Sequence, residues 1–266
     1  RERFLDQLLA CHREGARATL YVGGLAWHDH LVPERVWQEM SRALMHARPS
    51  RFFQVLRETG ALARILPELD ALWGVPQVPA YHPEIDTGEH VMLVLDEAAR
   101  MQAGLDVRFA CLVHDLGKAL TPAESLPKHH GHEKAGLGPV EDVCRRLKVP
   151  NETRELALLV CEFHLVCHRA AELNPGTVMR LLKRSDALRR PERFEYFLQA
   201  CEADKRGRKG RADQPYPAAD LLRRARAAAA GTTTAPLRQQ GLTGKALGEA
   251  LERARIRAIA TVMNES

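Results

Sequence analysis

The chain has 266 residues, of which 45% are hydrophobic, 27% are charged and only 5% are aromatic. This size allows one large domain or two small ones, with a core filled mainly by Leu, Ala and Val. No run of about 18 uncharged apolar residues is present, so we expect no membrane span. The formal net charge of +5 and the sequence pI of about 9.0 favour a polyanionic partner.

The cysteines and the start of the chain bear on its location. Six cysteines are scattered without a C-x-x-C pair, which argues against a zinc ribbon and predicts buried free thiols. Buried thiols suit a reducing compartment, so we expect a cytoplasmic protein. The first residues, Arg1-Glu2-Arg3-Phe4-Leu5-Asp6, do not form a secretory signal and lack Met, so we expect the inside of a longer protein.

Apolar residues recur at helical spacing along nearly the whole chain, and no segment shows convincing strand alternation. The first predicted helices cover residues 34–45 and 50–66, and Gly60 permits a turn within the second. A proline-rich stretch over residues 67–83 then breaks regular structure and marks a candidate domain boundary.

Two predicted helices follow this stretch and carry polar residues near their ends. The helix expected over residues 87–103 has His90 close to its N-terminus. The next, expected over residues 107–116, carries His114 and Asp115 in its last turn, and the glycine that follows can end it. Neighbours on a helix diverge by about 100°, so the two side chains face one space only if the backbone loosens there.

A polar loop is predicted over residues 121–132, and helices resume after it. Their predicted ranges are 133–147, 151–168, 175–186, 192–203, 217–230 and 244–260. The helix over 192–203 delivers Asp204 at its end. These patterns together predict an all-α fold.

His90, the pair His114-Asp115 and Asp204 therefore fall at three predicted helix ends, in the order H…HD…D. Neutral imidazole and ionised carboxylate are ligands that hard or borderline divalent cations accept. The pair lies in an apolar run, where polar side chains cost free energy unless something satisfies them. A bound divalent metal would do so, and a hydrogen-bonded core network is the alternative interpretation.

These four residues match the pattern of HD-domain phosphohydrolases. The sequence resembles more closely the bacterial CCA-adding enzymes, the multifunctional tRNA nucleotidyltransferases that carry an HD domain. The matching segments are residues 31–37, 52–62, 66–72, 82–90, 129–132, 162–164, 202–208 and 241–244. The resemblance implies a helical body segment over 1–80, an HD-domain helical core over 81–210 and a helical tail over 211–266.

The resemblance also implies roles for the four metal-site residues and their neighbours. His90, His114, Asp115 and Asp204 would hold the metal, with Ni²⁺ favoured and Mg²⁺ or Mn²⁺ possible. Lys118 would touch a substrate phosphate or balance the carboxylates, unless it is a surface lysine.

Six further residues are candidates for catalysis or substrate contact. His132 and His164 match histidines that in some HD proteins bind a second metal or protonate a leaving group, although a loop-stabilising role is the alternative. We expect substrate contact from His129 and His130. Arg206 and Arg208 suit phosphate contact, against the alternative of an exposed basic loop. His82 and His168 are interpreted as structural.

The implied activity is hydrolysis of 2′,3′-cyclic phosphates, 2′-nucleotides or phosphomonoesters, as at damaged tRNA ends. A rival interpretation is a tRNA-binding module with a vestigial HD site, and a homo-oligomer stays open. The family's polymerising head needs two carboxylates, two residues apart, after a Gly-Gly turn. Gly23-Gly24 is followed only by Asp29, so CCA addition is not expected from this chain unless another chain supplies a head.

Overall fold

The computed structural model describes residues 32–265, so Gly23-Gly24 and the first 31 residues of the expected body segment lie outside the described part. Within this part every regular element is a helix, and one isolated bridge joins Pro76 to Asp86. The predicted all-α fold is confirmed. Among the helices between residues 32 and 265, none combines the length and hydropathy needed to cross a bilayer.

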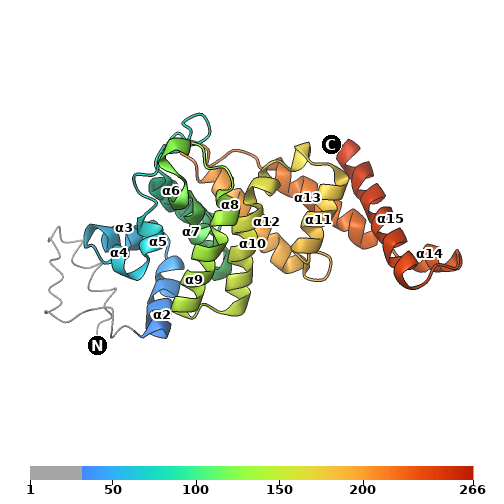
Figure 1. Ribbon diagram of the computed structural model, residues 1–266, viewed down its shortest axis with the longest axis horizontal. Helices are drawn as coiled ribbons and strands as arrows, with labels where there is room; N and C mark the ends of the chain where they lie inside the picture. The colour runs from blue at the N-terminus through green and yellow to red at the C-terminus, as the bar shows by residue number, and fades with distance from the viewer. Residues whose placement is uncertain (1–31, 266) are drawn as a thin grey trace.

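The first described helices form one end of the molecule (Figure 1). They are α2 (Pro33–Leu44), α3 (Ser50–Glu58), α4 (Leu62–Ile65) and α5 (Pro67–Asp70). Gly60, with a φ of 72°, makes the predicted turn between α3 and α4. Pro67 begins α5 instead of breaking regular structure, because a first helical position needs no N–H. Trp37 meets Phe109 edge to face, with ring centroids 5.2 Å apart, and so ties α2 to the centre.

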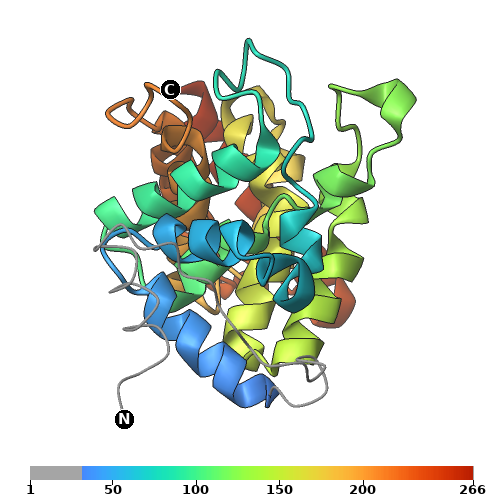
Figure 2. The same ribbon diagram turned by 90° about the vertical axis from the view of Figure 1, so that its left-hand side faces the viewer.

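The middle of the molecule is formed by six helices, which are labelled in Figure 1 and seen from one end in Figure 2. They are α6 (Thr87–Arg100), α7 (Leu105–Val113), α8 (His132–Ala135), α9 (Leu137–Leu147), α10 (Asn151–His168) and α12 (Pro191–Arg206). The helix α10 packs against α7, α8, α9 and α12, while α6 packs against α7 and α12. Phe109, Phe194 and Phe197 are fully buried between these helices. The core therefore holds α6, α7, α10 and α12 at fixed positions.

The C-terminal helices extend from the other end of the centre (Figure 1). They are α11 (Pro175–Arg184), α13 (Pro217–Gly231), α14 (Ala235–Gln239) and α15 (Gly244–Asn264). The helix α15 packs against α13 and α11, and buries Ile259 there. Three short 3-10 helices complete the described elements: η2 (Leu116–Leu120), η3 (Ala123–Ser125) and η4 (Ala170–Glu172).

The end of α7 differs from the predicted helix over residues 107–116. The α-helix stops at Val113, Asp115 adopts φ −107° and ψ 11°, and η2 continues through Gly117. A Cβ on Gly117 would lie 2.0 Å from the carbonyl oxygen of His132, so this glycine permits η2 and α8 to touch rather than ending a helix. The backbone thus leaves the α-helical conformation at the His114-Asp115 pair.

Candidate metal centre

The four predicted metal ligands converge in the interior, with side chains from α6, the end of α7, and α12. His90 Nε2 lies 3.0 Å from Asp204 Oδ1, and His114 Nε2 lies 3.2 Å from Asp115 Oδ2. The other two distances between these histidines and carboxylates are 3.8 Å, from His90 Nε2 to Asp115 Oδ2, and 3.9 Å, from His114 Nε2 to Asp204 Oδ1. All four residues are buried. Asp204 lies inside the last turn of α12, which runs to Arg206 instead of ending before Asp204 as predicted.

His132 and His164 lie near the second oxygen, Oδ1, of the Asp115 carboxylate. Asp115 Oδ1 is 3.2 Å from His132 Nε2 and 3.7 Å from His164 Nε2, and the two Nε2 atoms are 3.4 Å apart. The cluster therefore contains two groups of three residues whose candidate ligand atoms lie within 4.8 Å of one another: His90, His114 and Asp204, and Asp115, His132 and His164.

Oxygen acceptors outside the cluster fix the orientation of these imidazoles. The Nδ1 atoms lie 2.8 Å from Cys111 O for His114, 2.6 Å from His129 O for His132 and 3.0 Å from Val160 O for His164. Carbonyl oxygens only accept, so Nδ1 carries the proton in these three residues. In the neutral imidazole, their Nε2 atoms then present lone pairs to the cluster. His90 differs, because its Nε2 hydrogen-bonds Asp204 Oδ1 at 3.0 Å.

The electrostatics of the cluster favour bound positive charge. Burial lowers the pKa of His164 to about 3, so this imidazole is neutral near pH 7. Burial works to raise the pKa of Asp115, but the charges of His114 and Lys118 outweigh it and hold that pKa well below its usual value. Burial works to lower the pKa of His114, yet the neighbouring Asp115 reverses the direction and raises it. The surroundings thus favour a cation at His114 Nε2.

The cluster also lacks donors for some of its acceptors. Within residues 32–265, His114 Nε2 and Asp115 Oδ1 are buried and make no hydrogen bond of good geometry. A core network, the alternative interpretation of the sequence, would pair these atoms with N–H or O–H groups. Imidazole and carboxylate together suit transition metals as well as Mg²⁺ and Mn²⁺. The cluster is therefore compatible with a divalent metal ion.

Lys118 and Arg208 lie beside the cluster. Lys118 is buried, and its Nζ donates to Asp115 Oδ2 and Gln77 Oε1, both at 2.6 Å, so it is not a surface lysine. Arg208 is also buried, with one nitrogen 3.8 Å from Asp204 Oδ1 and another donating to the carbonyl of Tyr81. Both cations therefore border the carboxylates.

The structure does not bring the other expected substrate contacts to the cluster. Arg206 pairs with Glu202 at 2.7 Å and donates to the Gln214 carbonyl instead. The ring nitrogens of His129 contact Thr121 Oγ1 at 2.7 Å and the Pro76 carbonyl at 2.9 Å, which fastens its loop. His130 is exposed.

Sequence reasoning missed two residues that contact the predicted ligands. His168, interpreted as structural, lies with Nε2 2.5 Å from Asp204 Oδ2. Glu84 contacts His90, and hydrogen bonds from His82 and His90 overcome burial to hold its pKa below the usual range. His168 follows His164 by four residues on α10, a spacing that places both on one helix face and could have signalled the contact.

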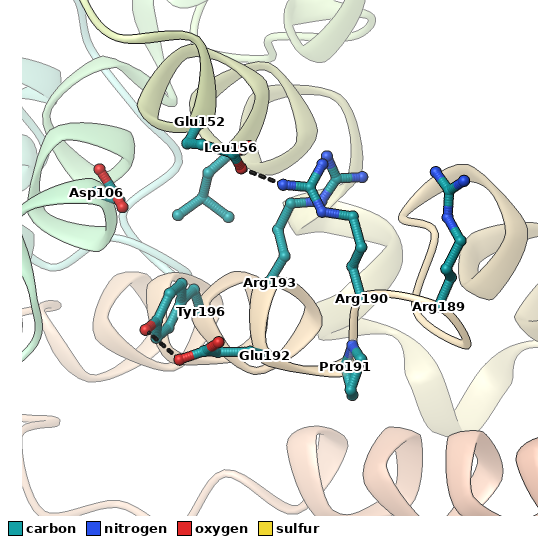
Figure 3. A pocket seen from close by; sticks show the side chains of 9 residues that line it. All are labelled: Asp106, Glu152, Leu156, Arg189, Arg190, Pro191, Glu192, Arg193 and Tyr196. Carbon is teal, nitrogen blue, oxygen red and sulfur yellow. Dashed lines mark hydrogen bonds and ion pairs between the residues drawn. The ribbon is translucent and has the colours of Figure 1, made fainter.

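A separate pocket lies between α10 and α12 (Figure 3). It is lined by Asp106, Glu152, Leu156, Arg189, Arg190, Pro191, Glu192, Arg193 and Tyr196. Arg190 and Arg193 both pair with Glu155, at 2.9 and 2.5 Å. Arg189 pairs with Asp186 at 2.7 Å. Because carboxylates already compensate these arginines, the pocket is a weak candidate for anion binding.

Comparisons with known proteins match two parts of the chain to described families. Residues 87–192 match the HD domain family, and residues 29–72 match a family described as "Probable RNA and SrmB- binding site of polymerase A". The cluster therefore lies in and just beyond the HD match.

Curated relatives extend the similarity to most of the chain. A multifunctional CCA protein of Thioalkalivibrio sulfidiphilus is 55% identical over 87% of this chain and 56% of its own length. Those of Halorhodospira halophila and Cupriavidus necator are 55% and 58% identical, over 88% and 87% of this chain and 56% and 57% of their own lengths. The chain spans about half the length of these relatives. It is thus a homologue of the multifunctional CCA proteins over that part, and it carries an HD domain.

Proposed function

We propose that the chain is a metal-dependent phosphohydrolase of the HD type. Its substrates would be 2′,3′-cyclic phosphates, 2′-nucleotides or phosphomonoesters, as found at RNA ends. The observation that supports this most is the convergence of histidine Nε2 atoms on two buried carboxylates, with His114 Nε2 and Asp115 Oδ1 lacking hydrogen bonds within the described residues. The HD match over residues 87–192 supports the same conclusion.

His90, His114, Asp115 and Asp204 would hold the cation. When bound, a divalent cation supplies a Lewis acid for a phosphoryl oxygen and lowers the pKa of a water molecule. Lys118 uses two of its three N–H groups on Asp115 and Gln77, so one remains for a substrate phosphate. Arg208, 3.8 Å from Asp204 Oδ1, adds a second positive charge beside the carboxylates.

His132 and His164 would act on the leaving group. Backbone carbonyls hold their Nδ1 atoms, so each Nε2 faces the cluster and could take a proton from the attacking water and pass it to a departing ribose oxygen. The same two atoms and Asp115 Oδ1 could instead hold a second cation. The two roles differ in the number of metal ions bound per chain.

RNA binding is a second candidate function, and a specific match favours it. Residues 29–72 resemble a described RNA-binding site, and the net charge of +5 suits a polyanion. The relatives' name, multifunctional CCA protein, leads us to propose tRNA as the RNA that is bound. Binding of tRNA without metal-dependent turnover would support this function alone.

Hydrolysis of 2′,3′-cyclic AMP by the purified chain tests the proposed function. We expect turnover with added Ni²⁺, and comparison with Mn²⁺ and Mg²⁺ ranks the metals. Asp115→Ala should abolish turnover, whereas Asp142→Ala, which removes an exposed carboxylate on α9 paired with Arg145, should leave it unchanged. Equal rates for Asp115→Ala and the parent chain would reject the assignment.

A further inference from the structure

The two oxygens of Asp204 face different partners. Oδ1 points toward His90 and His114, whereas Oδ2 is 2.5 Å from His168 Nε2. Nitrogen atoms of neighbouring side chains surround the Asp204 carboxylate, with His90 Nε2 3.0 Å and an Arg208 nitrogen 3.8 Å from Oδ1. A carboxylate only accepts, so His168 must donate its Nε2–H to Oδ2.

His168 therefore presents an N–H at Nε2, where His114, His132 and His164 present a lone pair. Its other ring nitrogen, Nδ1, lies 2.9 Å from the hydroxyl oxygen of Tyr216. The Tyr216 hydroxyl donates to Cys167 Sγ at 3.2 Å, which completes a buried chain of polar groups from Asp204 to Cys167.

We infer that His168 and Tyr216 are positioning residues that fix Asp204 for cation binding, an inference that rests on the proposed function. His168 occupies Oδ2 and so leaves Oδ1 for the cation, and the Tyr216 hydroxyl, hydrogen-bonded to Nδ1, holds the ring of His168 in that orientation. Tyr216 directly precedes α13, so the first residue of the C-terminal helices contributes to the centre through His168. His168 is not a ligand in this arrangement, because its Nε2 carries a proton.

Titration of the purified chain with Co²⁺, followed by its visible absorption and by calorimetry, tests this inference. His168→Leu removes the donor and should weaken Co²⁺ binding roughly ten- to hundredfold, the usual effect of removing a residue that holds a ligand. Tyr216→Phe removes one hydroxyl and should weaken it about tenfold. His168→Gln keeps an N–H donor for Oδ2 and should bind within about threefold of the parent, with an unshifted absorption band.

Two controls separate positioning from general loss of structure. Tyr196→Phe removes the hydroxyl that donates to Glu192 on the surface of α12, and should leave Co²⁺ affinity unchanged. Thermal unfolding without metal checks that each variant is folded, and Tyr216→Phe is the milder variant if His168→Leu fails that check. Parent-like affinity in Tyr216→Phe and His168→Leu would overturn the inference alone. A shifted band and equal loss in His168→Gln would also overturn it, because His168 would then be a ligand. Absence of Co²⁺ binding by the parent chain would overturn the proposed function and this inference together.

Discussion

At the scale of single residues, the centre is a set of acceptors with few donors. Asp115 contacts four of its side chains: Oδ2 faces His114 and Lys118, and Oδ1 faces His132 and His164. Lys118 offsets this negative charge by donating to Asp115 Oδ2 at 2.6 Å. In the proposed function it would lower the affinity for a cation, and its remaining N–H would contact a substrate phosphate.

Replacing Lys118 should change affinity and turnover in opposite directions. In Lys118→Met, a competing charge next to Asp115 is lost, so Co²⁺ should bind at least as tightly as in the parent. Turnover of 2′,3′-cyclic AMP should fall at least about tenfold, because a contact to the transferred phosphate is removed. Calorimetry and an activity assay measure both quantities, and Lys134→Met, at an exposed position on α8, is the control. Unchanged turnover would show that Lys118 only balances charge.

At the scale of elements, most helices could be predicted from the sequence, because apolar spacing reports which face is buried. The predicted ranges 151–168 and 175–186 compare with α10 (Asn151–His168) and α11 (Pro175–Arg184). The junction after Val113 could not be predicted, because a 3-10 turn there depends on contact with α8, which lies elsewhere in the chain. The spacing of His164 and His168 indicated a shared helix face, but the partner of His168 could not be predicted, because 36 residues separate it from Asp204 and only tertiary packing joins the two.

The junction between η2 and α8 should tolerate no side chain at position 117. In Gly117→Ala, the added Cβ would meet the His132 carbonyl at 2.0 Å and Gly136 N at 2.6 Å. Backbone atoms must move to relieve this clash, so we expect a loss of about 1–3 kcal/mol in the free energy of unfolding and weaker Co²⁺ binding. Gly138→Ala, where nothing lies within 4 Å, should be neutral or stabilising by up to about 1 kcal/mol. Urea denaturation compares them, and equal stability of the two variants would contradict the packing described.

Two helix caps offer a matched test of how α6 presents His90. Asp86 accepts from Glu89 N at 3.0 Å at the start of α6 and from Gly74 N at 2.6 Å, and Asn174 accepts from Thr177 N at 2.8 Å at the start of α11. Asn174→Ala should cost about 1 kcal/mol of stability, and Asp86→Ala should cost more, because it also removes the acceptor of Gly74 N. Only Asp86→Ala should also weaken Co²⁺ binding, because α6 carries a proposed ligand and α11 does not. The same Co²⁺ affinity in both variants would argue against this account of α6.

At the scale of the whole molecule, the centre lies between two helical ends (Figure 1). The N-terminal end includes most of the segment that matches an RNA-binding family, and the C-terminal end reaches the centre through Tyr216. The sequence motifs predicted the metal site and the RNA-binding segment. The contact between Tyr216 and His168 could be recognised only from the fold. Under the functions proposed above, RNA would bind along the surface of the molecule and react in its middle.

Binding of tRNA should depend strongly on salt. Because lysines and arginines would displace counterions from the phosphates, the logarithm of the association constant should fall linearly with the logarithm of the salt concentration. Filter binding of labelled tRNA between about 50 and 200 mM salt measures this slope. An affinity independent of salt would contradict an electrostatic RNA surface, whereas it would leave the metal centre untouched.

Metal analysis of the purified chain after equilibration with Ni²⁺ and removal of free ions tests the central claim most directly. We predict at least one tightly held ion per parent chain, with one ion supporting His132 and His164 as proton carriers and two ions supporting a second cation between them. His114→Ala should retain none at the first position, while His46→Ala, at an exposed position, should match the parent. A parent chain that holds no ion, or a His114→Ala chain that holds as much as the parent, would contradict the account.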